Sequence, residues 1–330
     1  MSDIARDGPA KIAAHAPLLV TGLPRSGTSW TGKMLEASGQ VVYINEPMSP
    51  RRPPGGSPGV LDAQVDHRLQ YIDPAEPRAW TSAFQATLEL RFQAMAEIRS
   101  IRRPYHAARA VKYATAFAVG RHRNRRAMLD DPNALFASRW LASAMGVGVV
   151  IVVRDPVGVI GSWRQLGWKP HLEDLLAQGA LMRDHFAHRR SDIERAEGSG
   201  NWLEQMCCLW NLGNEFVDVV RSEVDGVLVW RYEDLAFDPL QQFRSLYGQC
   251  GLDFSSGACD RINRATSSTV DAGHRGFAWS LMGGVSRTAF RQMDSRAAVT
   301  GPDQRLRPDE IDLIRTRTSA VLDRFPRSTG

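Results

Sequence analysis

The sequence predicts an α/β fold, with a central parallel sheet flanked by helices. Short apolar runs of strand length alternate along the chain with longer stretches of helical composition, which is typical of a parallel sheet covered on both faces. The clearest run, at residues 148–153, reads GVVIVV and contains no polar side chain, as expected for a strand buried on both faces. No linker divides the chain, so we expect one domain over residues 17–330 after a flexible N-terminal arm over residues 1–16.

The elements follow from the pattern of apolar residues and from the breakers between them. Short apolar runs predict strands at residues 17–21, 41–44, 109–113, 148–153 and 227–231. Longer stretches of helical composition predict helices at residues 28–38, 80–99, 132–145, most of 172–222, 239–249 and 308–324. Part of this helical content is expected to form insertions that face the substrate. The stretch at residues 50–59, PRRPPGGSPG, is too rich in proline and glycine for regular structure, so we expect a mobile loop there.

Composition narrows the class of protein. The 330 residues include 41 Lys and Arg against 36 Asp and Glu, a net charge of +5 that suits an anionic ligand without being that of a polycation. The four cysteines have neither the density of a disulfide scaffold nor the spacing of a zinc site, so we expect them to be reduced. No stretch approaches the roughly 20 apolar residues of a membrane helix, and the N-terminus lacks an apolar leader. We expect a cytoplasmic protein.

A glycine-rich loop lies between the first predicted strand and the first predicted helix. It reads GLPRSGTS over residues 22–29, and in this context backbone amides and the helix N-terminus can hold a phosphate. Its glycine spacing resembles a P-loop, but Thr28 occupies the position of the essential lysine, and the loop carries Arg25 instead. Hydrolysis of a nucleoside triphosphate is therefore disfavoured. A purely structural alternative is that Gly22, Pro24 and Gly27 only shape a tight turn.

A second candidate anion site follows the clearest strand. The sequence Arg154-Asp155-Pro156 can begin a helix, which puts Arg154 at the carboxyl end of the strand and Ser162 two turns along. Arginine offers forked donors to a phosphate, and serine adds a hydroxyl group. The alternative for Arg154 is a structural ion pair with a carboxylate such as Asp155.

Together these motifs resemble the PAPS-dependent sulfotransferase family, in which PAPS is 3′-phosphoadenosine-5′-phosphosulfate. The 5′-phosphosulfate loop of the family is matched by Pro24, Arg25, Ser26, Gly27, Thr28, Ser29 and Trp30. Its 3′-phosphate motif is matched by Arg154 through Ser162, and its RYEDL segment by VWRYEDL at residues 229–235. Arg25, where cytosolic aryl and steroid enzymes usually carry lysine, is more similar to the carbohydrate and tyrosylprotein branches. The resemblance implies a P-loop-like α/β fold and a metal-independent reaction that leaves adenosine 3′,5′-bisphosphate.

The resemblance also implies catalytic roles. Glu46 follows the second predicted strand in INEPM, which is similar to the EP element of carbohydrate sulfotransferases, and we expect it to be the general base. Its alternative is a loop carboxylate paired with Arg51 or Arg52. Arg25 is expected to offset charge that develops on the phosphosulfate. Lys112 resembles a mid-chain lysine of the tyrosylprotein branch, which implies that it could offset the same charge. The alternative is that Lys112 is a solvated lysine at a strand end.

Later segments offer further donor contacts. GGVSR at residues 283–287 resembles the segment that closes over the donor, so that Ser286 could donate to the bridging oxygen and Arg287 could hold a phosphate. Tyr232 or Trp30 could flank the adenine, although an aromatic residue after a strand is more often core.

Other readings of the sequence carry less weight. His185 and His188 lie one turn apart without a third ligand, so no metal site is expected. The basic cluster at residues 121–126 is short and lacks interleaved aromatics, which favours a solvated helix face over nucleic-acid binding. The alternative functions are a P-loop nucleotide kinase or NTPase and a non-catalytic nucleotide-binding module. The expected acceptor is a carbohydrate, glycolipid or small natural product, and a homodimer stays open.

Overall fold

The computed structural model describes residues 11–50, 60–101, 104–266, 278–280, 284–286 and 305–327. Five strands form a parallel sheet in the order β2-β3-β1-β4-β5. Their bounds are β1 Leu18–Thr21, β2 Val41–Asn45, β3 Arg126–Asp130, β4 Gly148–Val153 and β5 Val227–Arg231. The predicted fold class, a central parallel sheet flanked by helices, is confirmed.

The helices and the remaining short elements lie around this sheet. The helices are α1 Thr28–Glu36, α2 Arg78–Leu88, α3 Ala94–Ser100, α4 Pro104–His122, α5 Ser138–Met145, α6 Pro156–Leu166, α7 Leu172–Leu176, α8 Gly179–Leu181, α9 Arg190–Gly198, α10 Trp202–Glu223, α11 Tyr232–Phe237, α12 Pro239–Gln249, α13 Ser256–Thr266 and α15 Pro308–Leu322. A π-helical turn spans Met182–Phe186, and 3₁₀ turns span Pro132–Ala134 and Ala187–Arg189. Two short strands, β6 Ala278–Ser280 and β7 Gly284–Ser286, pair antiparallel.

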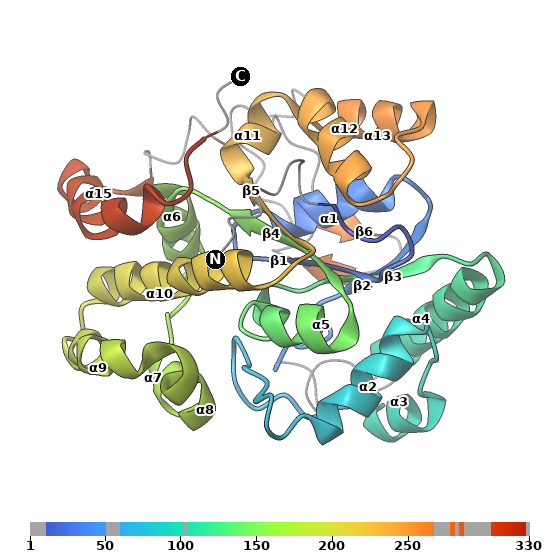
Figure 1. The fold of residues 1–330 in the computed structure, drawn as a ribbon, viewed down its shortest axis with the longest axis horizontal. Helices are drawn as coiled ribbons and strands as arrows, with labels where there is room; N and C mark the ends of the chain where they lie inside the picture. Colours follow the sequence, from blue (N-terminus) through green and yellow to red (C-terminus); the bar gives the residue numbers. More distant parts are fainter. Residues whose placement is uncertain are drawn as a thin grey trace, which may run out of the picture.

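Each face of the sheet buries its own apolar layer because successive side chains of a strand point to opposite faces. Leu18 and Val20 of β1 pack with Trp30 of α1 and with α12, whereas Leu19 belongs to the layer that includes Phe216 of α10. Figure 1 shows the result, with α1, α11, α12 and α13 above the sheet and α5 and α10 below it. Every residue of β4 is buried, as its unbroken apolar sequence predicts.

One predicted strand is wrong, and one strand was missed. Residues 109–113 lie inside helix α4, where Arg109 forms a buried ion pair with Glu97 of α3. The true third strand is β3, and it begins at Arg126, within the cluster that we assigned to a solvated helix face. The guanidinium group of Arg126 donates to the backbone oxygens of Ala16 and Cys250, at 2.6 and 2.8 Å, so it is a structural residue.

Smaller differences concern helix ends and the start of the chain. Residues 132–145 form a 3₁₀ turn and then α5 rather than one helix, and residues 80–99 are divided between α2 and α3. Within the segment assigned to the arm, Ile12 is buried, and its amide donates to the carbonyl of Gln249 at 2.8 Å. The loop at residues 51–59 lies outside the described part of the chain.

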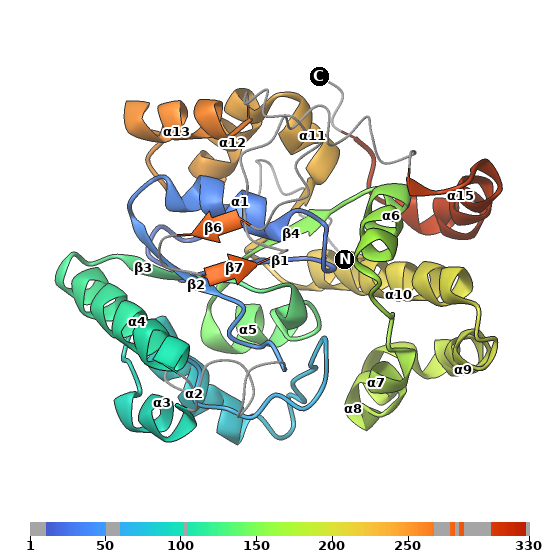
Figure 2. The ribbon, with the colours of Figure 1, turned by 180° about the vertical axis from the view of Figure 1, so that it is seen from behind.

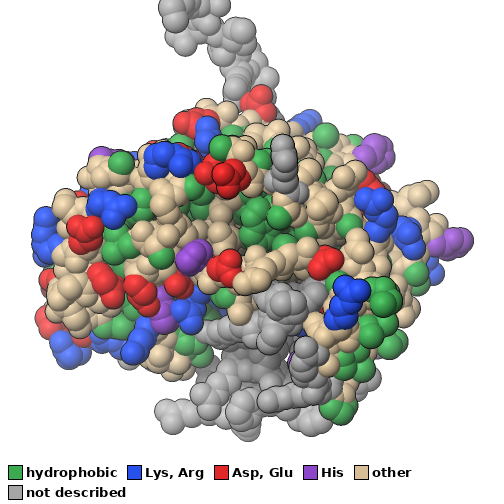
Figure 3. Space-filling model, turned by 90° about the horizontal axis from the view of Figure 1, so that it is seen from below, with side chains coloured by type: hydrophobic (Ala, Val, Ile, Leu, Met, Phe, Trp, Pro, Cys, Tyr) green, Lys and Arg blue, Asp and Glu red, His purple; other side chains and the backbone are tan. Residues whose placement is uncertain are grey.

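The C-terminal helix completes the layer below the sheet. Helix α15 packs against α10 and α6, an arrangement visible from both sides in Figures 1 and 2. Arg164 of α6 pairs with the nearly buried Glu310 of α15 at 2.5 Å. On the face shown in Figure 3, basic and acidic side chains are interspersed rather than gathered by sign. Among the described residues, no helix has the length and apolarity needed to cross a membrane.

Candidate active site

The loop between β1 and α1 depends on two glycines with positive φ. A Cβ atom at Gly22, where φ is 150°, would lie 2.3 Å from the backbone oxygen of Val152 in β4. A Cβ atom at Gly27, where φ is 100°, would lie 2.4 Å from the ring of Tyr232. No side chain caps the N-terminus of α1 at Gly27. The amides of that first turn are therefore available to an anion.

The two predicted anion motifs meet at this loop. Arg25 adopts a positive φ of 79°, and its Nε donates to Oγ of Ser162 at 2.9 Å. Arg154 donates from Nη1 to the backbone oxygen of Arg25 at 3.1 Å. Arg25, Arg154 and Ser162 thus join the carboxyl ends of β1 and β4, at the edge of the sheet where α/β proteins bind ligands in a crevice. The site formed by these three residues is called the crevice below.

The RYEDL segment after β5 holds this arrangement in place. The guanidinium group of Arg154 lies 4.4 Å from the ring centre of Tyr232, a cation–π contact. The buried carboxylate of Glu233 accepts from the backbone amide of Asp155 at 2.8 Å and from Arg231 at 2.9 Å. Asp155 itself caps α6 by accepting from the amide of Val157. A sequence segment noted only by resemblance therefore positions Arg154 and the helix that carries Ser162.

A third arginine, which sequence reasoning missed, approaches the same crevice. The pKa of Arg25 is lowered by burial and by the charges of Arg154 and Arg305. The pKa of Arg305 is lowered by partial loss of water and by the charge of Arg154. Arg305 precedes α15, more than a hundred residues from either motif, and no local pattern marks it. Like charges that crowd together in this way favour an anionic ligand.

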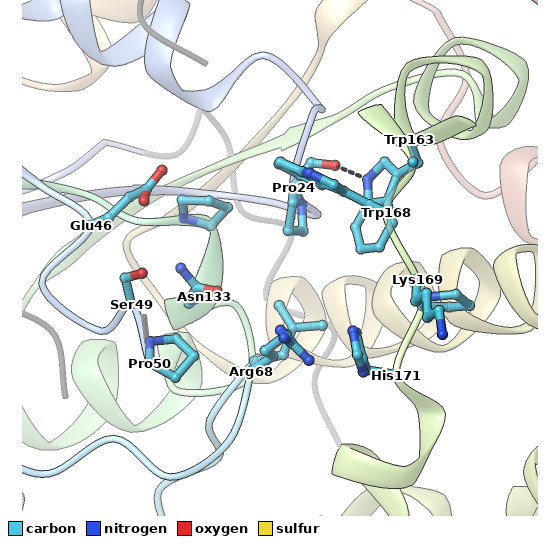
Figure 4. Close-up of a pocket in the computed structure, with 14 residues that line it drawn as sticks. Pro24, Glu46, Ser49, Pro50, Arg68, Asn133, Trp163, Trp168, Lys169 and His171 are labelled. Atoms are coloured by element: carbon cyan, nitrogen blue, oxygen red, sulfur yellow. Dashed lines mark hydrogen bonds between the residues drawn. The ribbon is translucent and has the colours of Figure 1, made fainter. Parts of the chain in front are cut away.

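A cavity of about 330 Å³ lies beside the loop, and Glu46 lines it (Figure 4). Glu46 follows β2, with a positive φ of 46°, and its amide donates to the backbone oxygen of Asp130 at 2.8 Å. The other lining residues are Pro24, Ser49, Pro50, Arg68, Leu69, Pro132, Asn133, Trp163, Gly167, Trp168, Lys169, Pro170 and His171.

The crevice and the cavity share a wall. Pro24 and Trp163 line the cavity, and the indole Nε1 of Trp163 donates to the backbone oxygen of Pro24 at 2.7 Å, the bond drawn in Figure 4. Their chain neighbours Arg25 and Ser162 bind each other in the crevice. A group held in the crevice therefore borders the space in which a second molecule fits.

Two buried carboxyl groups stand below Glu46, and sequence reasoning missed both. Burial, followed by the charge of Glu46, raises the pKa of Asp131 to about 7, and burial is also the main cause that raises the pKa of Asp130 to about 7. The hydroxyl group of Tyr43 donates to Asp130 in a short hydrogen bond, while Asp131 accepts from the amide of Met48 at 2.5 Å. The DDP sequence at the end of β3 is a visible signal, but the sequence analysis predicted only a helix from Pro132 onward and assigned no role to the two aspartates.

The remaining predicted residues lie in different places. Ser26 and Thr28 are buried in the loop and the first turn of α1, and Ser29 hydrogen-bonds to Asp130. Trp30 and Tyr232 are both buried, with ring centres 5.6 Å apart, so they form core beneath the crevice.

The other candidates do not line the cavity. Lys112 is an exposed residue of α4, near the ring of Tyr113. Ser286 ends β7, whose side chains are outside the description, and Arg287 lies outside the described residues altogether. Within the ranges that the structure covers, no group of three or more His, Cys, Asp or Glu is placed to hold a metal ion.

Several solved structures are similar to this chain. The sulfotransferase domain from the curacin biosynthetic pathway aligns with 93% of this chain over 99% of its own length, at 13% identity and a TM-score of 0.49. The sulfotransferase domain from the Synechococcus PCC 7002 olefin synthase aligns with 93% of this chain over 96% of its own length, at 16% identity and a TM-score of 0.41. Sulfotransferase STF9 from Mycobacterium avium aligns with 96% of this chain over 78% of its own length, at 12% identity and a TM-score of 0.42. None of the curated proteins compared with the chain matches it.

A family model covers the part of the chain that builds the site. The model of the sulfotransferase family matches residues 17–256, well over half of the sequence. The matched part contains the loop with Arg25, the helix with Ser162 and the segment after β5. Members of this family are enzymes that use a sulfate donor such as PAPS. On this match, with the geometry of its crevice, the chain belongs to the sulfotransferase family.

Proposed function

We propose that this enzyme transfers a sulfuryl group from PAPS to a hydroxyl group of a small organic acceptor, with Glu46 as the general base. The observation that carries the proposal is the shared wall. Pro24 and Trp163 line the cavity while the neighbouring Arg25 and Ser162 face the crevice. A sulfuryl group held by the loop would border an acceptor beside Glu46.

The crowding of positive charge supports PAPS as the donor. Burial, followed by the charges of Arg154 and Arg305, lowers the pKa of Arg25. PAPS carries anionic groups at both its 5′ and 3′ ends, and forked guanidinium donors suit both. Arg25 and the first amides of α1 fit the phosphosulfate end, and Arg154 with Ser162 fits the 3′-phosphate. Arg305 would add a third cation to the same nucleotide.

Proton transfer to Glu46 makes the chemistry balance. Glu46 accepts the proton of the acceptor hydroxyl as the oxygen of that group forms its bond to sulfur. The bond between sulfur and the bridging phosphate oxygen breaks, and its electron pair stays on the leaving adenosine 3′,5′-bisphosphate. Arg25 offsets the charge that grows on that oxygen. Roles for Lys112, Ser286 and Arg287 stay predictions.

The backbone of Glu46 also favours a functional role. A residue other than glycine with positive φ costs roughly 1–2 kcal/mol, and such residues cluster at active sites. Glu46 keeps this conformation between β2 and the buried Met48. The rival kinase or NTPase function is not favoured, because the chain belongs to the sulfotransferase family and Thr28 replaces the required lysine.

Substitution of Glu46 by Gln tests the proposal. Glutamine keeps the size of the side chain but cannot accept the proton, so kcat/KM for transfer of labelled sulfate from PAPS should fall at least about 100-fold. The dissociation constant for adenosine 3′,5′-bisphosphate, measured by calorimetry, should change less than about twofold, because the crevice is intact. The matched control is Glu194→Gln on α9, an exposed residue that should leave both quantities unchanged.

Two results would overturn the proposal. Retention of more than a third of wild-type turnover by Glu46→Gln would remove Glu46 as the base. Failure of the wild-type protein to bind adenosine 3′,5′-bisphosphate, with no transfer to any of a panel of phenols and alcohols, would remove the proposed donor.

A further inference from the structure

The charges that line the cavity are arranged by sign. Glu46 lies at one end of the cavity and Lys169 at the other, with Arg68 and His171 along the side between them (Figure 4). Between them the lining is mainly apolar, with the rings of Trp163 and Trp168 and the side chains of Leu69 and several prolines. An acceptor that fills this space meets a carboxylate at one end and a cation at the other.

The three basic residues are not equivalent. Arg68 lies 3.6 Å from Asp174, and His171 lies 2.7 Å from Glu173, and neither carboxylate lines the cavity. Asp174 and Glu173 therefore hold the side chains of Arg68 and His171 in place. Lys169 is exposed and makes no ion pair in the part of the chain that the structure describes. Of the three basic side chains, it is the one that no described carboxylate pairs with.

The wall that carries Arg68 is tied to the helices behind it. The backbone amide of Tyr71 donates to Oε1 of Gln178 at 2.7 Å, and the side-chain Nε2 of Gln178 donates to the carbonyl of Leu69 at 3.3 Å. The hydroxyl group of Tyr71 also donates to Asp184 at 2.9 Å. Because these bonds join residues more than a hundred positions apart, the wall is a fixed surface that tertiary structure builds.

Backbone strain is concentrated at the same cavity. Six non-glycine residues of the described chain have positive φ, and three of them, Glu46, Leu69 and His171, line it. Conformations of this kind persist only where the surrounding structure enforces them, and they gather at ligand sites. The lining of the cavity is thus held in strained but fixed positions at several points.

We propose that the acceptor is a hydroxylated molecule with a flat or apolar body and a separate anionic group, and that Lys169, assisted by Arg68, binds this anion. The inference rests on the proposed function, because the hydroxyl group is assigned to the Glu46 end. The cavity volume lies within the range of small-molecule sites. Lys169 is then a specificity-determining residue, because it selects an acidic acceptor over a neutral or basic one.

Three phenols of similar size, whose side chains carry different charges, test the inference. They are 4-hydroxyphenylacetate, tyrosol and tyramine, which share the ring and hydroxyl group and end in an anionic, a neutral and a cationic group. With labelled PAPS and wild-type enzyme, kcat/KM for the acid should exceed that for tyrosol about tenfold and that for tyramine by more. Lys169→Met should bring the acid and tyrosol within about twofold, and Lys169→Glu should invert the order of the acid and the amine.

The matched control is Lys11→Glu. Lys11 is exposed and adjoins Ile12, which packs against Gly148 at the amino end of β4, far from the cavity at the carboxyl ends. This variant should keep the wild-type order of the three acceptors. Calorimetric binding of each phenol to the enzyme saturated with adenosine 3′,5′-bisphosphate gives the same order without turnover.

The outcomes separate this inference from the proposed function. Equal kcat/KM for the three phenols, an unchanged order in Lys169→Glu, or no binding of any phenol would overturn the anionic acceptor while leaving sulfuryl transfer intact. Binding of the acid that depends on Lys169, without transfer from PAPS, would support the acceptor site and count against the proposed reaction.

Discussion

Individual residues at this site occupy states that are unfavourable elsewhere in a protein. Arg25 and Glu46 both have positive φ, at the ends of neighbouring loops, and Asp130 and Asp131 are fully buried carboxyl groups. Burial raises the pKa of Asp130 to about 7, although a hydrogen bond from Tyr43 opposes this effect. These buried carboxyl groups and strained backbone conformations lower the stability of the protein, a pattern typical of functional sites.

The raised pKa of Asp130 predicts a dependence of stability on pH. A carboxyl group whose pKa is higher in the folded state binds more protons when folded, so the free energy of unfolding should fall as pH rises from about 4 to 7 and then level off. A shift of about three units corresponds to roughly 4 kcal/mol at most. Asp130→Asn, which cannot ionise, should weaken this fall, so its stability deficit relative to wild type should shrink as pH rises.

Urea unfolding of the wild type and of Asp130→Asn at pH 5, 6, 7 and 8 measures how the free energy of unfolding depends on pH. The control Asp260→Asn replaces an exposed carboxyl group on α13 and should keep the wild-type dependence. A pH profile for Asp130→Asn parallel to that of wild type would contradict the buried, protonated state.

At the scale of elements, the site depends on how closely the loop after β1 approaches its neighbours. Gly22 lies against the backbone of β4, and Gly27 lies against Tyr232 at the start of α11. Trp30 packs edge-on against Tyr232 and against Phe243 of α12. The first turn of α1 therefore sits on an aromatic support, and the same Tyr232 contacts Arg154.

Substitution of Gly27 by Ala should disturb both the loop and the donor site. The added Cβ would meet the ring of Tyr232 at 2.4 Å, in addition to the strain of a positive φ. Because strain and clash add, we expect the free energy of unfolding to fall by more than roughly 2 kcal/mol. Binding of adenosine 3′,5′-bisphosphate should weaken at least about tenfold.

Gly39→Ala is a matched control for this change. Gly39 also has positive φ, but its Cβ would meet nothing within 4 Å. The free energy of unfolding of Gly39→Ala should fall by only about 1 kcal/mol, and this variant should bind the nucleotide as the wild type does. Equal nucleotide affinity in the two variants would show that the contact between Gly27 and Tyr232 is not required.

At the scale of the whole molecule, the crevice combines segments that are far apart in sequence. Three adjacent strands of the sheet, β1, β4 and β5, are followed by Arg25, Arg154 and Tyr232. Arg305 comes from beyond the part that the family model matches. Buried Arg231 donates to the backbone oxygen of Phe325 at 2.7 Å, which ties the end of α15 to the same network. The segment after α15 is thus tied to the residues that support the crevice.

This convergence of charge predicts that nucleotide binding stabilises the whole protein. Adenosine 3′,5′-bisphosphate at about 100 times its dissociation constant should add about 2.7 kcal/mol to the free energy of unfolding and raise the Tm. Adenosine 5′-monophosphate and 3′-monophosphate, at equal concentration, should each raise the Tm less, because each lacks one phosphate.

Thermal unfolding with each nucleotide measures these shifts. Raising NaCl from 50 to 500 mM should reduce the stabilisation, because salt screens exposed arginines such as Arg305. EDTA should not change it, since guanidinium groups supply the positive charge. Equal Tm shifts for the three nucleotides would contradict two separate phosphate contacts.

The sequence alone predicts strands β1, β2, β4 and β5, the glycine-rich loop after β1, and Arg25 and Arg154 at strand ends. These are local signals, because a buried parallel strand requires an unbroken apolar run and a tight turn requires glycine at particular positions. Strand β3 escaped detection because it begins with Arg126, whose guanidinium group donates to the distant carbonyl groups of Ala16, Cys250 and Gly251. Residues 109–113 were mistaken for a strand because their pattern is ambiguous over so short a run.

The surroundings of Arg25 and Glu46 depend instead on tertiary packing. The shared wall of Pro24 and Trp163, the approach of Arg305, and the opposition of Glu46 to Lys169 each join residues that no sequence spacing relates. The physical reason is that a motif specifies the conformation of its own backbone. Which charges and rings face one another across a cavity depends on how the layers of the sheet and helices pack.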